Sequence, residues 1–330
     1  MGAVKEFPHG RYHGVLRQWK RRTLMAAESD AERKARAGLR YIRLMQGYMP
    51  LALMQRLVPM DARRAQLPAG VSRSTVLADS VPCEWLIPED SPADRALVYL
   101  HGGGFVFGVS SLHLQMVAVL AQKMNVRALM VDYRLAPQHP FPAPLEDCVT
   151  ACRWLFREGF AAQNVVIAGD SAGGHLTLTT LMKLRDDGDP LPGAAACLSP
   201  VADLTDKGQL LAQGYDPLLH PRASKKFQQS FVAGNDPNNP LVSPVYGDWH
   251  GLPPLLIHAG EDELLRADAL RCESLAQAAG VDVRLEIYPR MWHVWQLNLG
   301  VPDAQKALDG IAQFLTGHLE RVVASSSPVA

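Results

Sequence analysis

Residues 165–174 read Val-Val-Ile-Ala-Gly-Asp-Ser-Ala-Gly-Gly, and this stretch decides the fold. Its four leading apolar residues predict a short buried strand, and good helix formers follow from position 172. Between them, Gly169, Ser171 and Gly173 fit the pattern G-x-S-x-G, in which a tight strand-to-helix turn requires small residues beside the serine. Such a turn holds the serine hydroxyl exposed above the end of a sheet. The stretch therefore predicts Ser171 as a nucleophile; the alternative is a glycine-rich turn with an incidental serine.

Alternation of strand and helix continues on both sides of this turn. Further short apolar runs lie at 96–100, 128–131, 194–198, 255–259 and 283–288, and helix candidates lie near 111–124, 143–158, 172–186, 267–279 and 303–323. Runs that are apolar throughout are typical of strands covered on both faces. The pattern predicts an α/β fold with a mostly parallel central sheet flanked by helices, and residues 74–87 are expected to add an antiparallel hairpin.

A second glycine-rich segment, His-Gly-Gly-Gly-Phe at 101–105, follows the strand predicted at 96–100. Glycines let the backbone approach a ligand and direct N–H groups towards it. In acyl transfer, such groups and the N–H of the residue after the nucleophile, here Ala172, stabilise the oxyanion. A dinucleotide site is not predicted, because the loop lacks the full G-x-G-x-x-G spacing.

A serine nucleophile needs a base and an orienting acid, and on this scaffold the order is serine, acid, histidine. Only His293 and His318 follow the acidic cluster Glu261-Asp262-Glu263. His293 comes just after a predicted strand, whereas His318 lies in the last predicted helix, so His293 is the expected base. Asp262 is the preferred acid because it lies immediately past the strand at 255–259. The remaining candidates for the acid are Glu261, Glu263 and Asp268.

The composition is that of a globular protein, with 48% hydrophobic residues and 33 basic against 33 acidic residues in 330. This balance argues against a nucleic-acid binder, which needs a basic surface. It conceals an asymmetry: residues 1–60 carry 12 basic and 4 acidic side chains, a net +8, so the rest carries −8. We expect a basic segment lying on an acidic body; the alternative is a basic segment that meets a membrane surface or an anionic partner.

Five scattered cysteines, Cys83, Cys148, Cys152, Cys197 and Cys272, predict neither a disulfide framework nor a zinc site. The N-terminus lacks the apolar core of a signal peptide, and no apolar run reaches the length of a membrane span. A cytoplasmic protein without stable membrane insertion is expected.

Residues 38–58 are rich in apolar side chains, and Pro50 predicts a break between two helices. These helices either pack on the body or cap a cleft, with Met45, Tyr48 and Met49 lining it. The expected division is a helical cap region with its linker at 1–73, a catalytic domain at 74–324 and a flexible tail at 325–330. Residues 204–232 interrupt the alternation and are expected to contribute to the cap.

Several segments together resemble the hormone-sensitive lipase family of α/β-hydrolases, the bacterial family IV esterases. They are HGGGF at 101–105, DYRLAPQHPFPAPLED at 132–147, GDSAGG at 169–174, GLPPLLIHAGEDELLRAD at 251–268 and MWHVW at 291–295. The resemblance implies an α/β-hydrolase fold with an N-terminal helical cap, and a triad of Ser171, Asp262 and His293. It further implies oxyanion-hole N–H groups on Gly103, Gly104 and Ala172, structural roles near the site for His101 and Asp170, and pocket positions for Phe105 and Trp292.

The function predicted on these grounds is hydrolysis of small carboxylic esters of short-to-medium acyl chains through a covalent acyl-enzyme. No metal and no organic cofactor is expected. The same triad would serve a lactone hydrolase, and a non-catalytic receptor for a small ligand is a third possibility. A homodimer through the last strand is the partner implied by the resemblance.

Overall fold

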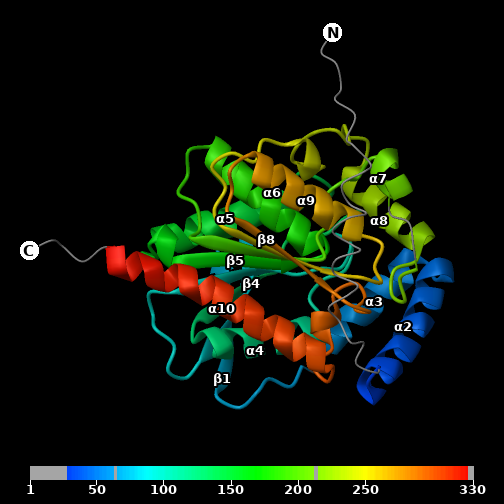
Figure 1. Cartoon of the computed structure of the whole chain (residues 1–330), viewed down its shortest axis with the longest axis horizontal. Coiled ribbons are helices and arrows are strands. Elements are labelled where there is room, and N and C mark those ends of the chain that lie inside the picture. Colours follow the sequence, from blue (N-terminus) through cyan, green and yellow to red (C-terminus); the bar gives the residue numbers. More distant parts are fainter. Residues whose placement is uncertain (1–27, 63–64, 212–214, 326–330) are drawn as a thin grey trace, which may run out of the picture.

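The computed structural model describes residues 28–62, 65–211 and 215–325. Its centre is an eight-stranded sheet in the order β1-β2-β4-β3-β5-β6-β7-β8 (Figure 1). Strands β1 and β2 form an antiparallel hairpin, β2 is antiparallel to β4, and all later neighbours are parallel. The mostly parallel sheet and its leading hairpin confirm the predicted fold class.

The strands are β1 (Val71–Ala78), β2 (Val81–Pro88), β3 (Ala96–Leu100), β4 (Arg127–Val131), β5 (Val165–Asp170), β6 (Ala194–Leu198), β7 (Leu255–Gly260) and β8 (Val283–Tyr288). The α-helices are α2 (Asp30–Tyr48), α3 (Leu51–Ala62), α4 (Ser111–Met124), α5 (Ala143–Arg157), α6 (Ala172–Asp186), α7 (Asp206–Leu211), α8 (Pro221–Val232), α9 (Arg266–Ala278) and α10 (Pro302–Ser325). Short 3-10 turns lie at Ala162–Asn164, Pro244–Tyr246 and Trp295–Leu297.

Helices cover the sheet on both faces, as the uniformly apolar strands require. Helices α5, α6 and α9 pack on one face and α4 and α10 on the other, so that two separate apolar cores lie against the sheet (Figure 1). Every residue of β3, β5, β6 and β7 is buried. Because the parallel strands all end at one edge, the loops that follow β3, β5, β7 and β8 come together there.

Helices α2, α3, α7 and α8, which we call the cap, lie together beside that edge (Figure 1). Ser29 and Glu32 form a capping box at the start of α2, and Pro50 separates α2 from α3. Residues 1–27 and 326–330, which include half of the 12 basic side chains of the N-terminal segment and all but the first residue of the expected tail, lie outside the described residues.

The cap is tied to the loops it covers. Gln55 of α3 donates from Nε2 to the carbonyl of Val106 at 2.8 Å, just past the glycine segment at 101–105. Phe227 of α8 packs so closely on Gly104 that a Cβ there would lie 2.9 Å from its ring. Arg43 of α2 donates to the carbonyl of Leu219, which joins the two parts of the cap. Among the described residues, no helix is long and apolar enough to cross a membrane.

Candidate active site

Ser171 lies in the turn between β5 and α6. Its φ of 52° is left-handed, and its N–H donates to the carbonyl of Leu198 on the neighbouring strand β6. A Cβ on Gly169 would meet the backbone of Gly173, and one on Gly173 would overlap the carbonyl of Leu100. The glycines on either side of the serine are therefore required by close backbone approach, and the turn holds a strained serine at the edge of the sheet.

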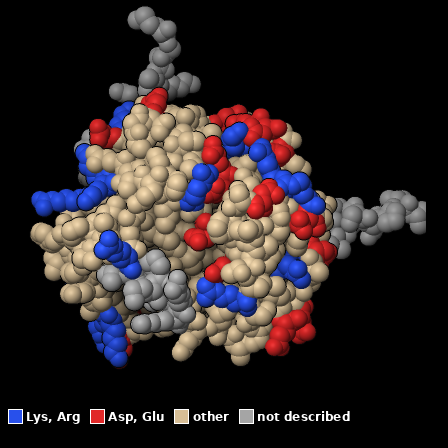
Figure 2. All heavy atoms as spheres, turned by 180° about the vertical axis from the view of Figure 1, so that it is seen from behind, with Lys and Arg blue, Asp and Glu red and all other residues tan. Residues whose placement is uncertain are grey.

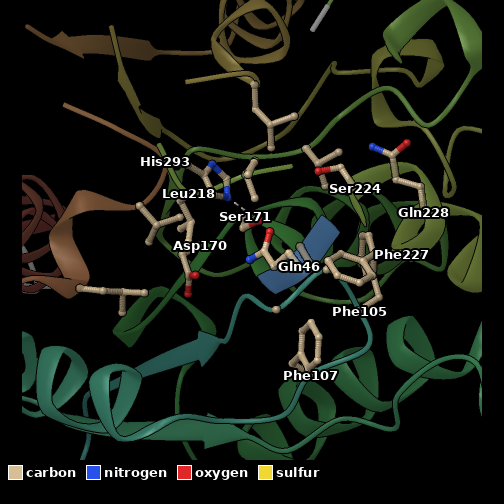
Figure 3. A pocket seen from close by; sticks show the side chains of 18 of the residues that line it. Gln46, Phe105, Phe107, Asp170, Ser171, Leu218, Ser224, Phe227, Gln228 and His293 are labelled. Atoms are coloured by element: carbon tan, nitrogen blue, oxygen red, sulfur yellow. Dashed lines mark hydrogen bonds between the residues drawn. The ribbon is translucent and has the colours of Figure 1, made fainter. Parts of the chain in front are cut away.

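His293 lies in the loop after β8 with its Nε2 2.8 Å from Ser171 Oγ, the contact drawn as a dashed line in Figure 3. The side chain is buried, and burial lowers the pKa of His293 below its ordinary value. A neutral imidazole at this distance can take the hydroxyl proton. The structure thus brings together the serine and the histidine expected from the sequence.

The carboxylate that approaches the other ring nitrogen is that of Glu263. Its Oε2 lies 3.9 Å from His293 Nδ1, in the loop between β7 and α9. Ser199 Oγ donates to the same oxygen at 2.7 Å and accepts from the N–H of Val294, the residue after the histidine. The side chain of Glu263 is fully buried, and burial, reinforced by the nearby Asp216 carboxylate, raises its pKa to about 8.

The pKa of Glu263 is raised and that of His293 is lowered for the same main reason, because burial opposes charge on either group. Once the imidazole takes a proton, the carboxylate form of Glu263 becomes favourable at this distance. The arrangement can therefore orient the imidazole and stabilise an imidazolium.

Asp262, the acid preferred on sequence grounds, points away from the histidine. Its Oδ2 accepts from Arg36 of α2 at 2.8 Å, and its side chain is 40% exposed. The physical reason is the turn after β7: the N–H of Asp262 donates to the carbonyl of Met291, which turns this side chain outward and the next one inward. The carboxylate beside His293 is therefore that of Glu263 and not that of Asp262.

The two remaining acidic candidates also lie elsewhere. Glu261 accepts from the N–H of Arg290 at the surface. Asp268 is buried in α9, where it accepts from the N–H groups of Ala202 and Asp203. Both carboxylates hold loops in place rather than meeting the imidazole.

The glycine segment after β3, the expected oxyanion-hole loop, has positive backbone angles that favour glycine, with φ of 123° at Gly103 and 60° at Gly104. These glycines and Ala172, the residue after the serine, line the same cavity as Ser171. The loop is anchored by Asp170, which accepts from the N–H of Gly102 at 3.0 Å and from the hydroxyl of Tyr99 at 2.9 Å. His113 Nε2 lies 3.4 Å from the other oxygen of this carboxylate.

His101 supports the loop from behind. Its ring stacks on Tyr133 at a centroid distance of 4.3 Å, and its Nδ1 lies 2.7 Å from the carbonyl of Gly102. Burial lowers the pKa of His101 to about 4, which keeps the ring neutral. His101 and Asp170 therefore contact the glycine loop from behind and lie beside the site, where a structural role was predicted for each.

Ser171 opens into a cavity of about 200 Å³ between the sheet edge and the cap (Figure 3). Its walls are mainly apolar, and Phe105, Phe107 and Phe227 supply the aromatic ones. Phe105 is the one predicted pocket residue that the cavity contains. An ester of modest size fits a space of this volume and character.

The other predicted pocket residues lie outside the cavity. The side chains of α2 that are turned to the body are Glu32, Arg36, Leu39, Arg43 and Gln46. Met45 and Tyr48 fall on other faces of the helix, and Tyr48 is 75% exposed. Met49 follows the helix as its C-cap and is not among the residues that line the cavity. Trp292 is buried under α2, where Arg36 lies 5.2 Å above its ring. The residue of α2 that lines the cavity is Gln46.

Several residues of the site were not singled out from the sequence. They are Ser199, Asp216, Gln46, Phe107, Phe227 and His113. The short sequence motifs do not contain them, and the topology alone brings them to the serine. Among the described residues, no three His, Cys, Asp or Glu side chains are grouped so that they could hold a metal ion.

Comparison with known proteins agrees with this geometry. Residues 97–297 match the family described as alpha/beta hydrolase fold. An acetyl-hydrolase of Streptomyces hygroscopicus is 40% identical over 235 residues, covering 70% of this chain and 78% of the relative. An esterase of Acinetobacter venetianus is 32% identical over 234 residues, covering 70% and 77%.

Solved structures are similar over still more of the chain. An esterase from the bacterial hormone-sensitive lipase family has a TM-score of 0.81 at 34% identity, covering 89% of this chain and all of that one. The esterase EstE5, soaked with p-nitrophenyl butyrate, has a TM-score of 0.82 at 35% identity, covering 88% and 99%. With the serine–histidine pair in place, the chain is a carboxylic ester hydrolase, and it belongs to the hormone-sensitive lipase family of the α/β-hydrolase fold.

Proposed function

We propose that the chain hydrolyses esters of short-to-medium acyl chains through Ser171 as nucleophile, His293 as base and Glu263 as orienting acid. The observation that carries the proposal is the 2.8 Å contact between His293 Nε2 and Ser171 Oγ, with the buried carboxylate of Glu263 beyond Nδ1. The similarity to an esterase soaked with p-nitrophenyl butyrate supports a short acyl group.

The reaction follows from the placement of these groups. His293 takes the proton of Ser171 as its oxygen attacks the ester carbonyl, and the negative oxygen is bound by the N–H groups of Gly103, Gly104 and Ala172. The imidazolium, stabilised by Glu263, returns the proton to the leaving alcohol. Water then repeats the sequence on the acyl-enzyme and releases the acid.

Labelling with a fluorophosphonate followed by mass spectrometry tests this proposal. We expect one adduct, on Ser171, and Ser171→Ala is expected to lower kcat by ~10⁶ while leaving the fold intact. A folded wild-type protein without an adduct, or a Ser171→Ala variant with most of its activity, would contradict the assignment.

Two further points belong to the same proposal. All five cysteines are buried and unpaired, which supports residence in a reducing compartment such as the cytoplasm.

Strand β8 pairs with β7 and ends the sheet of the described residues, so its outer edge supports pairing with a second copy. Light scattering coupled to size-exclusion chromatography distinguishes a dimer from a monomer.

A further inference from the structure

The side of the cavity formed by the cap carries three uncharged polar side chains. Gln46 projects from α2, and Ser224 and Gln228 project from α8 (Figure 3). Contact of a purely hydrocarbon acyl chain with Gln46 would be unfavourable, because such a chain cannot bind a polar group that it shields from water.

Within this set, Gln46 has a side-chain oxygen that lacks a hydrogen-bond partner. Its Oε1 is buried and has no hydrogen-bond partner within the described part of the chain. A buried amide oxygen without a partner loses its bond to water and gains none in exchange. A donor on a bound ligand would supply the missing bond.

The donor must be neutral. The titratable side chains that line the cavity are Asp170, His113 and His293. Asp170 is already bound by Tyr99 and Gly102, and His293 faces the serine. Among the described residues that line the cavity, no carboxylate is left to balance a cationic substituent near Gln46, and none is a Lys or Arg that could balance an anionic one.

The position of Ser224 and Gln228 relative to the histidine identifies the part of the ester that reaches this side of the cavity. His293 returns its proton to the leaving alcohol, so the alcohol lies on its side of Ser171. In Figure 3, Ser224 and Gln228 lie on the opposite side of Ser171 from His293. The acyl group therefore extends towards α8.

We propose that the space between α2 and α8 is a subsite for acyl groups that carry a hydroxyl or an amide N–H, with Gln46 Oε1 as its acceptor. Ser224 and Gln228 provide the rest of its polar wall. The inference rests on the proposed function, because the direction of the acyl group follows from the roles of Ser171 and His293.

A matched pair of substrates tests the subsite. Aryl esters of 3-hydroxybutanoic acid and 3-methylbutanoic acid share a leaving group and differ by a hydroxyl in place of a methyl. Each kcat/KM is divided by the rate of alkaline hydrolysis of the same ester, and the two hydroxy enantiomers are measured separately. For one enantiomer we expect the hydroxy ester to be preferred by about tenfold, the effect of one added neutral hydrogen bond.

Variants then assign the preference to Gln46. In Gln46→Met, which keeps the length of the side chain without the amide, the ratio of hydroxy to methyl ester is expected to fall towards one. Gln46→Leu serves as a second variant in case the first folds poorly. Gln229→Leu is the matched control, since Gln229 is the exposed neighbour of Gln228 on α8 and should leave the ratio unchanged. All rates are expressed per active site titrated with fluorophosphonate.

The inference is overturned by a wild-type ratio of one or less for both enantiomers, or by a ratio that persists in fully titrated Gln46→Met. These results differ from a failure of the proposed function. If the proposed function itself is wrong, no adduct forms on Ser171 and neither ester is hydrolysed.

Discussion

At the scale of single residues, the site depends on which of two adjacent carboxylates turns inward after β7. Asp262 pairs with Arg36 at the surface of the site, whereas Glu263 is buried beside His293. Ser199 donates to Glu263 and also accepts from the backbone N–H next to His293, so one hydroxyl contacts both the Glu263 side chain and the histidine loop. A network of this kind is sensitive to a change in any of its members.

Substitution of each carboxylate by its amide separates their roles. Glu263→Gln is expected to lower kcat by about 10³–10⁴, because an amide can stabilise the wrong tautomer of the imidazole and cannot stabilise the imidazolium. Asp262→Asn, the matched control one residue away, is expected to lower kcat by less than about tenfold, since it weakens only a half-exposed ion pair. Steady-state kinetics of both variants decide between them: a larger loss in Asp262→Asn would return the orienting role to that residue.

The pH dependence of the reaction follows from the burial of His293. The imidazole acts as a base only when neutral, and burial lowers its pKa below the ordinary value of 6.5. Protonation therefore sets in at a lower pH, and activity persists into more acidic solution. We expect the acidic limb of kcat/KM, measured between about pH 4 and about pH 9, to have its midpoint below that of a free imidazole. A midpoint at or above 6.5 would contradict the effect of burial.

The sequence predicts Ser171 from its motif, and it predicts His293 because this histidine follows both the acidic cluster and a strand, whereas His318 lies in the last helix. The sequence was insufficient for the acid, because Glu261, Asp262 and Glu263 all follow the same strand. Which of them faces the imidazole depends on the turn between β7 and α9, where the N–H of Asp262 bonds to the carbonyl of Met291. The two residues of this contact are 29 positions apart in the sequence, so no local sequence pattern indicates it.

At the scale of the elements, too, some features could be predicted from the sequence and others could not. Buried strands and their helices could be predicted closely: the helices expected at 111–124 and 172–186 are α4 and α6, and Pro50 separates α2 from α3 as expected. The residues that line the cavity could not be predicted, because a helix such as α2, with charged and apolar residues interspersed, offers more than one face to the body. The body selects the face with Arg36 and Gln46, and the methionines fall outside the cavity.

Through Arg36, helix α2 contacts the loops that carry Glu263 and His293. The guanidinium pairs with Asp262, next to Glu263, donates to the carbonyl of Arg290 and lies over the ring of Trp292, next to His293. Its side chain is only 13% exposed, in contrast to that of Arg33 on the same helix at 59%. Arg36 is therefore placed to set the position of α2 over the cavity.

Replacement of Arg36 by methionine keeps the apolar stem and removes the charge. We expect KM for an aryl butanoate to rise about two- to fivefold with a smaller change in kcat, because the cap is held less firmly while Ser171 and His293 keep their contact. Arg33→Met is the matched control and should leave both constants unchanged, since Arg33 pairs with Asp30 at the surface. Equal effects of the two variants would show that the charge of Arg36 has no special role.

At the scale of the whole molecule, the balanced charge of the chain is unevenly distributed. Figure 2 shows acidic and basic side chains interspersed over the side away from the cap, whereas the side of the cap has a broad uncharged area edged by basic groups. The ion pairs between the cap and the body have both polarities: Arg36 of the cap pairs with Asp262, and Glu32 of the cap pairs with Arg290. The cap is thus joined to the body by paired charges at its inner face.

Salt tests whether these paired charges hold the cap over the cavity. The ion pairs between α2 and the loops after β7 and β8 are partly exposed, so added ions weaken them, and the Debye length falls from about 10 Å at 0.1 M to about 3 Å at 1 M salt. For an uncharged ester we expect KM to rise about two- to fivefold over this range, with a smaller change in kcat. In Arg36→Met the rise should be reduced, because the principal pair is already absent. If KM of the wild-type enzyme is independent of salt, or rises equally in the variant, packing alone positions the cap, and the uneven charge is a property of the solvated surface.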